Sequence, residues 1–406
     1  MAEAGNDDKS AEEAGAPDAA AAAEPLRPTA SGHLPFTSGR SPGGWRADDR
    51  PRARRGPVYG ALDLGTNNCR LLIARPSRRG FVVLDAFSRI IRLGEGVSAS
   101  GRLSDASIDR AIDALGICAS KLARHDVRRM RLVATQACRM AENGRYFVER
   151  VERDLGLTLE VLTPESEARL AVAGCVPLID PDCDLAMVFD IGGGSSELIW
   201  LDLTRRKVAP DGRWRDEAQR RITDRSAFDD CIVAWVSLPV GVVTLAENHG
   251  GRHVTPAQFE GMVDHVTELL TPFERAHGFR QRVAGARAHF LGTSGTVTTV
   301  AGIKLDLPRY ERSKVDGCWL AADEVREVTY RLVSCSYEQR IAEPCIGRDR
   351  ADLVLAGCAI LEALMRMWPI ERLRVADRGL REGILARLMA EDGFHIGGIE
   401  RQRDVV

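Results

Sequence analysis

Three loops of this sequence combine glycine with Ser, Thr or Asn, residue types that bind phosphate through free backbone N–H groups and short polar side chains. They run over residues 63–68, 190–196 and 292–296, and each follows a run of β-forming residues. One such loop would be explained as well by a hairpin turn. Three loops in one chain, two of them beginning with Asp, favour phosphate binding. The predicted phosphate-binding residues are Gly65, Thr66, Asn67, Asn68, Gly192, Gly193, Gly194, Ser195, Gly292, Thr293, Ser294 and Gly295.

None of these loops is a common nucleotide-binding motif. The Walker A pattern G-x-x-x-x-G-K-[ST] and the dinucleotide fingerprint are both absent from the sequence, and the first two loops lead into expected strands. The third loop differs because residues 297–302 are expected to be helical. The free N–H groups at the start of that helix would face a phosphate. The alternative is that the start of this helix only packs against the rest of the protein and binds no phosphate.

Asp63 and Asp190 stand at the ends of two expected strands, and in a repeated arrangement both carboxylates would face one cleft. Mg²⁺ beside a polyphosphate is usually held by one or two protein carboxylates and keeps several waters. The two residues therefore indicate a Mg²⁺ site. The alternative is that each Asp hydrogen-bonds within its own turn.

Two further charged residues follow expected strands. Arg139 comes after the β-type run 131–133, and Glu167 comes after the run 159–162. The carboxyl ends of strands are where ligands collect in α/β proteins. A carboxylate there can deprotonate an attacking water, and an Arg can neutralise a transferring phosphoryl group. From the residues alone, surface positions at helix starts are the simpler interpretation.

The elements that position these residues come in a repeated pattern. Residues 58–74 and 186–200 each show a β-type run, a turn-rich break and a second β-type run, which predicts two hairpins. A shift of 190 − 63 = 127 residues superposes Asp63 on Asp190. Expected strands and helices alternate along both halves, so the predicted fold class is α/β with two related halves.

The expected helices carry their own start signals. Ser104 is placed to cap a helix whose apolar stripe runs from Ile108 to Leu122. Residues 255–258, Thr-Pro-Ala-Gln, combine an N-cap, a proline at the first helical position and a capping-box Gln. Residues 323–334 and 352–367 are also predicted to be helical.

The composition describes a soluble globular protein. The chain has 406 residues, 44% hydrophobic and 28% charged, and its 56 Lys and Arg against 58 Asp and Glu give no reason to expect nucleic acid as a partner. The ten cysteines form no C-x-x-C pair, and no Cys/His cluster has zinc spacing. No apolar run approaches the ~20 residues of a membrane-spanning helix. Without a secretory leader, the chain is expected to be cytoplasmic and without a membrane partner.

Two segments stand apart from this pattern. Residues 1–57 lack periodic apolar positions and are expected to be disordered. Residues 202–230 are rich in Arg, Asp, Trp and Lys and are expected to form a surface insertion.

Taken in order, the motifs resemble the signature of the exopolyphosphatase and guanosine pentaphosphate phosphohydrolase (Ppx/GppA) family. The segment 373–383, Leu-Arg-Val-Ala-Asp-Arg-Gly-Leu-Arg-Glu-Gly, is similar to the C-terminal motif of that family. The resemblance spans about residues 58–390. The other five motifs that carry it lie at 63–70, 134–139, 167–170, 189–198 and 292–296.

The resemblance implies two ribonuclease-H-like domains of the actin, sugar-kinase and heat-shock ATPase superfamily, with an active-site cleft between them. The expected boundaries are 58–172 and 173–390, with the insertion in the second domain and a tail at 391–406. The implied activity is Mg²⁺-dependent release of the terminal phosphate from inorganic polyphosphate, or of the 5′ γ-phosphate from guanosine pentaphosphate. The resemblance is also compatible with a homodimer, although no heptad or apolar stripe demonstrates one.

The resemblance also implies roles for individual residues. Glu167 matches the family's catalytic glutamate, which aligns or activates the water, and Arg139 matches its phosphate-contacting arginine. Asp190 and Glu197 match the acidic residues near the metal, to which the hairpin argument adds Asp63.

The chain departs from the family pattern in two places. Residues 163–166 read Thr-Pro-Glu-Ser, where the family commonly has Ser-Gly followed by acidic residues, so Glu165 is not expected to supply a second acidic role. The chain resembles the short two-domain form, so the C-terminal helical domain of long members is not expected in it. Two other functions stay open: a phosphotransferase acting between polyphosphate and a nucleotide, and a non-catalytic sensor of a guanosine alarmone or polyphosphate.

Overall fold

The computed structural model describes residues 56–77, 80–205 and 230–394. The predicted disorder before residue 56, most of the predicted insertion and the end of the predicted tail lie outside the described residues. Within the described residues, no helix is long and apolar enough to cross a membrane.

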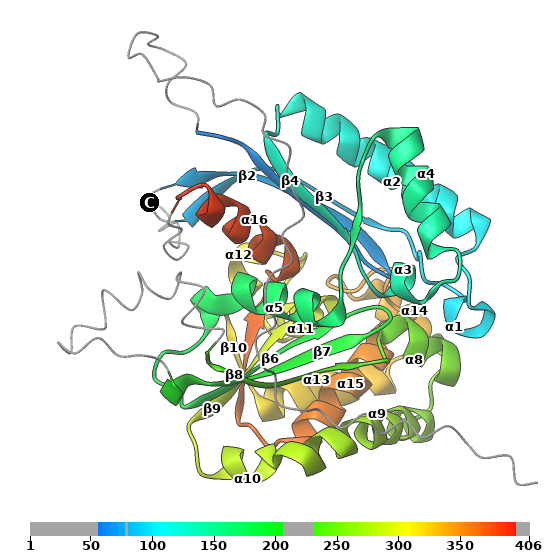
Figure 1. Cartoon of the computed structure of the whole chain (residues 1–406). Coiled ribbons are helices and arrows are strands. Elements are labelled where there is room, and N and C mark those ends of the chain that lie inside the picture. The colour runs from blue at the N-terminus through cyan, green and yellow to red at the C-terminus, as the bar shows by residue number, and fades with distance from the viewer. Residues whose placement is uncertain (1–55, 78–79, 206–229, 395–406) are drawn as a thin grey trace, which may run out of the picture. The chain divides into compact units, whose positions relative to one another are not determined.

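The first sheet has five strands in the order β3-β2-β1-β4-β5 (Figure 1). β1 pairs antiparallel with β2 and parallel with β4, which leaves the ends of β1 and β4 at one edge. The strands are β1 (Tyr59–Leu64), β2 (Asn68–Ser77), β3 (Gly80–Ile90), β4 (Arg129–Ala134) and β5 (Glu160–Val161).

The second sheet has six strands in the order β10-β11-β9-β6-β7-β8. β6 pairs antiparallel with β7 and parallel with β9, as β1 does with its own neighbours in the first sheet. The strands are β6 (Leu185–Ile191), β7 (Ser196–Asp202), β8 (Ile232–Leu238), β9 (Ala288–Thr293), β10 (Trp319–Ala321) and β11 (Arg372–Ala376).

The structure confirms the predicted repeat of two hairpins, and equivalent residues are paired in both. Asp63 pairs with Arg70 in the first hairpin, and Asp190 pairs with Glu197 in the second. Both turns close in the same way, because Gly65 N donates to the carbonyl of Asn68 and Gly192 N donates to the carbonyl of Ser195, each over 2.9 Å. The two Asp side chains therefore occupy equivalent places, each at the end of a central strand.

The expected helices form with the caps that the sequence predicts. Ser104 accepts a hydrogen bond from Ser107 N at the start of α2, and Thr255 forms a capping box with Gln258 at the start of α9. The helices are α1 (Val97–Ser100), α2 (Asp105–Arg124), α3 (Gln136–Met140), α4 (Gly144–Leu155), α5 (Pro164–Cys175), α8 (Val242–His249), α9 (Pro256–His277), α10 (Phe279–Ala284), α11 (Gly295–Lys304), α12 (Arg312–Val315), α13 (Ala322–Ser334), α14 (Tyr337–Ala342), α15 (Val354–Met367) and α16 (Leu380–Glu391), with short 3₁₀ turns at Val176–Leu178 and Leu203–Arg205.

Alternating residues of β1 pack on opposite faces of the first sheet, as the period of a strand requires. Leu62 and Leu64 belong to a core with α2 and α4, whereas Tyr59 and Ala61 belong to a core with α16. Figure 1 shows α16, the last helix of the described chain, beside the first sheet and close to α5. The C-terminal helix therefore completes the core of the N-terminal sheet.

Glycines allow α5 and α16 to pack very closely. A Cβ at Gly383 would lie 1.9 Å from the carbonyl oxygen of Leu170, and a Cβ at Gly174 would lie 2.0 Å from that of Gly379. Both distances are far below van der Waals contact, so no side chain fits at either position. Since α5 also packs on β7 and β8, these two helices join the two sheets.

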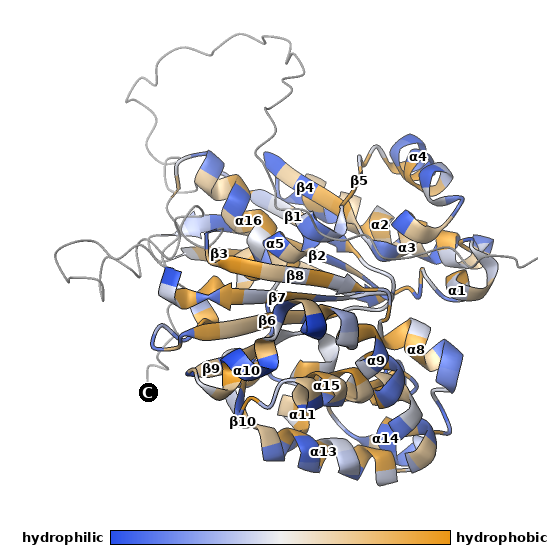
Figure 2. Ribbon diagram, turned by 60° about the horizontal axis from the view of Figure 1, so that its bottom comes forward, coloured by the Kyte–Doolittle hydropathy of each residue, from blue (hydrophilic) through white to orange (hydrophobic). Residues whose placement is uncertain are grey.

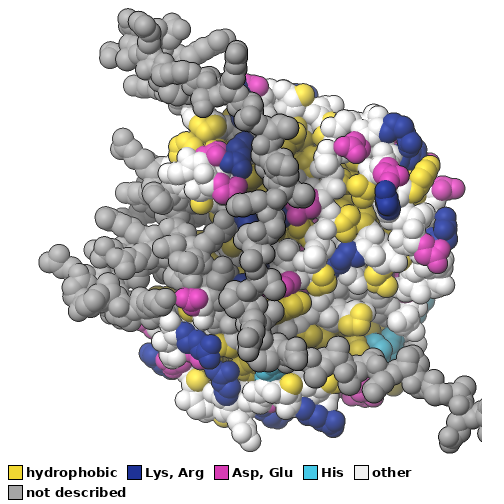
Figure 3. Space-filling view, in the orientation of Figure 1, with side chains coloured by type: hydrophobic (Ala, Val, Ile, Leu, Met, Phe, Trp, Pro, Cys, Tyr) yellow, Lys and Arg dark blue, Asp and Glu magenta, His cyan; other side chains and the backbone are white. Residues whose placement is uncertain are grey.

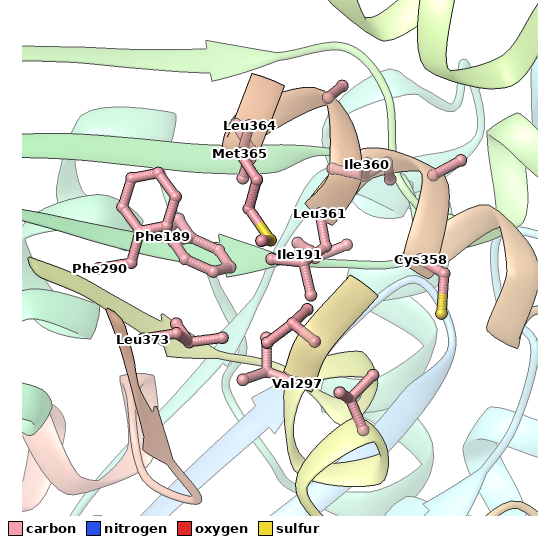
Figure 4. Packing of buried hydrophobic residues seen from close by; sticks show 14 of the residues in the cluster. Phe189, Ile191, Phe290, Val297, Cys358, Ile360, Leu361, Leu364, Met365 and Leu373 are labelled. Atoms are coloured by element: carbon pink, nitrogen blue, oxygen red, sulfur yellow. The ribbon is translucent and has the colours of Figure 1, made fainter. Parts of the chain in front are cut away.

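The largest core lies between the second sheet and the helices around α15. Figure 4 shows Phe189 and Phe290 next to Leu364 and Met365, with the two aromatic rings edge to face at a centroid distance of 5.8 Å. In Figure 2, β7 and α15 are largely hydrophobic, whereas the outer helix α13 alternates between polar and apolar faces. Burial of this apolar surface is the main stabilising contribution to the second half.

Charged side chains of both signs are interspersed on the described part of the face shown in Figure 3. This distribution agrees with the near-neutral net charge of −2.

Candidate active site

The turns of both hairpins line one cavity of about 130 Å³. The start of α11, the segment before α15 and the first residues of α3, α5, α8 and α16 also line it. Of the residues predicted from the sequence, the cavity is lined by Asp63, Gly65, Thr66, Asn67, Asn68, Glu167, Asp190, Gly192, Gly193, Gly194, Ser195, Ser294 and Gly295.

Four predicted site residues do not line this cavity. Gly292 is buried against Phe189, and the hydroxyl of Thr293 donates a 2.6 Å hydrogen bond to the carbonyl of Arg378. Glu197 lies behind the second turn, and Arg139 lies behind Glu167.

The two phosphate-type turns touch each other. A Cβ on Gly193 would lie 2.9 Å from Thr66 Cβ and 3.2 Å from Asn67 N, and a Cβ on Gly194 would lie 2.9 Å from Thr66 Oγ1. Glycine at these positions therefore lets the backbone of one turn approach the other. An anion between the turns would be contacted by both halves of the protein.

Glu167 reaches the cavity from the first turn of α5. The helix begins at Pro164, and the side chain of its N-cap Thr163 accepts a hydrogen bond from Ser166 N over 3.2 Å. This start places Glu167 one turn into the helix, on the side that faces the cavity.

Arg139, on α3, fixes the carboxylate of Glu167. Its Nη1 donates to Glu167 Oε2 over 2.7 Å and to the carbonyl of Leu162 over 2.8 Å. Gln136 Oε1 accepts two more hydrogen bonds from Arg139, of 3.1 and 2.7 Å. The guanidinium is therefore held on several sides, and Gln136 itself lines the cavity.

Four carboxyl groups are crowded together at the cavity. Burial raises the pKa of Asp190 to about 8, with further contributions from repulsion by Glu197 and Asp63. Burial and repulsion by Glu197 also raise the pKa of Glu167 well above its ordinary value, against the opposing effect of Arg139. The pKa values of Asp63 and Glu197 are raised chiefly by burial. Such a group of buried acids is stabilised by a cation.

The donor set fits Mg²⁺ held by few protein ligands. Within the described ranges no three His, Cys, Asp or Glu side chains are grouped as a ready-made metal cage. Asp63 and Asp190 do line the same cavity, and Mg²⁺ is commonly bound through one or two carboxylates with phosphate oxygens and waters as its other ligands. Glu197 differs because its Oε1 accepts hydrogen bonds from Ser195 Oγ, over 2.7 Å, and Ser237 Oγ, over 2.9 Å.

The third loop leads into a helix, as predicted. Ser294 caps α11 by accepting a 3.1 Å hydrogen bond from Val297 N, and Gly295 is the first helical residue. The start of this ten-residue helix therefore borders the cavity. Backbone N–H groups at such a helix start favour a bound anion.

The structure adds residues that the sequence analysis did not select. Arg70, Thr135, Gln136 and Arg350 line the cavity. Thr135 and Gln136 lie in the motif that includes Arg139, and Arg70 follows the first turn, so nearness to a motif could have indicated them. Arg350 precedes α15 and carries no such signal. Buried Asn67 Oδ1 is an acceptor without a hydrogen-bond partner among the described residues.

The most similar curated relatives include an enzyme whose name states its substrate. The chain is 26% identical over 340 residues to guanosine-5′-triphosphate,3′-diphosphate pyrophosphatase from Aeromonas hydrophila. The alignment covers 83% of this chain and 60% of that protein, so the chain spans less than two thirds of the relative's length.

Solved structures of similar length show the same fold. A Ppx/GppA family member from Aquifex aeolicus is 25% identical with a TM-score of 0.63, and the alignment covers 83% of this chain and 98% of the other. An exopolyphosphatase-like protein is 28% identical with a TM-score of 0.68, over 82% and 99% of the two chains. The predicted α/β fold class is confirmed, and the structure shows that it is built on two mixed sheets.

The profile of the Ppx/GppA phosphatase family matches residues 72–392, which is most of the chain. The match begins after the first glycine-rich turn and Arg70 and contains the other residues that line the cavity. The chain belongs to the Ppx/GppA phosphatase family.

Proposed function

We propose that this protein is a Mg²⁺-dependent phosphohydrolase that releases the terminal phosphate of inorganic polyphosphate, the 5′ γ-phosphate of guanosine pentaphosphate, or both. Membership of a phosphatase family and the name of the Aeromonas relative support the reaction class. The observation that carries the proposal is the Arg139–Glu167 pair beside a cavity built from two glycine-rich turns.

In the proposed reaction the terminal phosphoryl group lies between the turns 65–68 and 192–195. Backbone N–H groups of both turns, that of Ser195 among them, and the side chains of Thr66 and Asn67 would donate hydrogen bonds to its oxygens and orient them. This positioning, with charge stabilisation, is the larger part of phosphoryl-transfer catalysis. Asp63 and Asp190 would hold Mg²⁺, which supplies charge neutralisation to the phosphate oxygens when bound.

Glu167 would orient a water and accept its proton as the oxygen attacks phosphorus. Burial and repulsion by Glu197 raise the pKa of Glu167 above the ordinary carboxylate value, which makes this carboxylate a stronger proton acceptor. Arg139 positions Glu167 through its 2.7 Å hydrogen bond and adds positive charge behind the attacking water.

Phosphate release by the purified protein tests this proposal. Long-chain polyphosphate, guanosine pentaphosphate and ATP are supplied in parallel, with Mg²⁺ or with EDTA. Mg²⁺-dependent release from polyphosphate or guanosine pentaphosphate is expected, and it also identifies the preferred substrate. Absence of release from all three compounds would overturn the hydrolase assignment.

A further inference from the structure

Two cysteines contact each other next to the first glycine-rich turn. Cys69 Sγ lies 3.9 Å from Cys118 Sγ, and both residues are fully buried. Cys69 is the second residue of β2 and Cys118 lies on α2, so the contact joins two elements across 49 positions of the sequence. The proposed reaction uses neither thiol, which leaves this pair without a role in the chemistry described so far.

The position of Cys69 is coupled to the turn through the backbone. Cys69 pairs with Leu64 across the hairpin, and these two residues flank the turn 65–68. The loop after β3 holds the turn from another side, because the carbonyl of Asn67 accepts hydrogen bonds from the N–H groups of Ile91 and Arg92. A displacement of Cys69 would therefore distort the turn and would not move it as a unit.

The helix that carries Cys118 is held in place as well. Near its start, Arg110 Nε donates a 2.8 Å hydrogen bond to the carbonyl of Ile91. Near its end, Lys121 Nζ lies 2.7 Å from Asp85 Oδ1 on β3. Because α2 is fastened on both sides of Cys118, part of any shortening of the distance between the two sulfur atoms has to occur at Cys69.

A covalent bond between the two sulfur atoms would produce such a shortening. The sulfur–sulfur bond of a disulfide is ~2 Å long, so the atoms would approach each other by about 1.9 Å. We propose that Cys69 and Cys118 form a reversible disulfide that distorts the first glycine-rich turn and thereby switches the candidate active site off. The inference rests on the proposed function for the activity that is lost, whereas formation of the bond does not depend on it.

The oxidant is a peroxide, and the reaction takes place in two steps. One thiolate attacks an oxygen of hydrogen peroxide, the O–O bond breaks, and a sulfenic acid and hydroxide form. The second thiolate then attacks the sulfenic sulfur, the S–S bond forms, and hydroxide leaves. Both hydroxides take up the protons released by the thiols, so two thiols and one peroxide give one disulfide and two waters, and two electrons pass from sulfur to oxygen.

The surroundings of the pair set the speed of this reaction. The hydrogen bond with Cys118 and burial raise the pKa of Cys69, which keeps the reactive thiolate scarce. Oxidation of the pair is therefore expected to be slow, and the switch responds to sustained oxidation.

Peroxide treatment of the full-length, reduced protein tests the proposal. The background carries Cys318→Ser and Cys335→Ser, because these two cysteines are partly exposed and would form disulfides between molecules. After oxidation the free thiols are alkylated, and peptide mass spectrometry identifies the paired cysteines. Phosphate release is measured before oxidation, after oxidation and after reduction with dithiothreitol.

Cys118→Ala and Cys118→Ser remove the partner thiol while leaving the first turn and Cys69 unchanged. Cys358→Ala is the matched control, because Cys358 is another fully buried cysteine, on α15. Melting temperatures of the reduced variants establish that they fold.

We expect a disulfide between Cys69 and Cys118 and a loss of phosphate release of about tenfold or more, since a displacement of ~1 Å in a positioning group can cost ~10²-fold. Dithiothreitol should restore the activity. Both Cys118 variants should keep their activity in peroxide, and Cys358→Ala should lose it as the parent does.

Three results would overturn the switch: no disulfide after prolonged oxidation, a disulfide without loss of activity, or the same loss in the Cys118 variants. If the reduced protein releases no phosphate, the proposed function fails instead. Mass spectrometry and calorimetric binding of tripolyphosphate, before and after oxidation, then decide this inference on their own. Weaker binding in the oxidised protein supports it, and unchanged binding contradicts it.

Discussion

Arg139 Nη1 lies 2.7 Å from Glu167 Oε2, and this pair joins α3 to α5 directly behind the cavity. Both side chains are largely buried, with exposed fractions of 14% and 13%. The sequence separates them by 28 residues, and the strand ends of β4 and β5 bring them together. The carboxylate therefore has a fixed direction toward the cavity before any ligand arrives.

Replacement of Arg139 by Lys tests this positioning. A lysine keeps the charge but has no planar fork with which to contact Glu167, Leu162 O and Gln136 together. We expect kcat to fall about 10- to 100-fold, from the loss of charge-assisted hydrogen bonds, while KM changes less. Arg145→Lys is the control, because Arg145 forms an exposed pair with Glu149 on α4. Equal kcat for Arg139→Lys and the parent would contradict the positioning role.

Gly193→Ala tests the contact between the two turns. The added methyl group would lie 2.9 Å from Thr66 Cβ, so one turn must move away from the other. We expect at least a tenfold loss of phosphate release and a decrease in unfolding free energy of about 1–3 kcal/mol from overpacking, measured by enzyme assay and urea denaturation.

Gly261→Ala is the matched control for Gly193→Ala. Gly261 lies inside α9 with no heavy atom within 4 Å of the position of an added Cβ. Alanine there should increase the unfolding free energy by about 0.4–1 kcal/mol, because it restricts the unfolded chain, and should leave activity unchanged. If both variants kept full activity, close approach of the turns would not be required.

Arg92 and Asp352 form a bidentate ion pair, with N–O distances of 2.9 and 3.2 Å, between the loop after β3 and the start of α15. Arg92 holds a left-handed backbone conformation (φ 48°), and its N–H donates to the carbonyl of Asn67 in the first turn. The pair therefore connects the first phosphate turn to the segment that carries Arg350. We infer that it stabilises the arrangement of the two halves around the cavity.

Arg92→Gln is expected to raise KM by about fivefold, which corresponds to ~1 kcal/mol for a partly buried pair. Asp352→Asn should have a similar effect, and the double variant should lose little more than either single variant, because both remove the same interaction. The exposed pair of Arg102 and Glu142 supplies the control substitution Arg102→Gln. Fully additive effects on KM would show that the two residues act separately.

The buried ring of His289 leads us to predict that the free energy of unfolding decreases in acid. Its ring lies 3.0 Å from the carbonyl of Phe290 and accepts a 3.2 Å hydrogen bond from Asp180 N, and burial lowers its pKa from 6.5 to about 4. The unfolded chain therefore binds a proton between pH 6.5 and 4 that the folded protein does not bind. Stability contributed by neutral His289 is present above pH 6.5 and is lost as the pH falls toward 4, by about 3 kcal/mol at most.

Urea denaturation across this pH range measures the effect. The decrease in unfolding free energy between pH 6.5 and 4 should be smaller for His289→Gln than for the parent, and unchanged for His253→Gln at an exposed position. The same pH dependence in His289→Gln and the parent would contradict the prediction.

Local signals in the sequence predict much of this fold. The two hairpins share a pattern of apolar runs and turns, and the caps at Ser104 and Thr255 mark helix starts that the structure confirms. These features depend on neighbouring residues, which are visible in one sequence. For the same reason, the convergence of Asp63 and Asp190 on one cavity follows from the internal repeat.

Other features depend on contacts between distant segments. The packing of α16 against the first sheet joins residues such as Tyr59 and Ile384, and no periodicity in either segment identifies its partner. In the same way, no local pattern identifies Asp352 as the partner of Arg92. Glu197 illustrates a related case: the resemblance predicts it near a metal, but its hydrogen bond with Ser237 depends on how β7 pairs with β8.

The most direct test of the central claim is phosphate release by Glu167→Gln. The substitution keeps the size of the side chain and removes the group proposed to accept the proton of water, so kcat on polyphosphate or guanosine pentaphosphate should fall by ~10²–10⁴-fold. Glu165→Gln is the matched control, because Glu165 lies in the same turn of α5 and pairs with Arg169 at the surface. Loss of activity in Glu167→Gln alone is the predicted result. Activity equal to that of the parent would contradict the proposed catalytic role of Glu167.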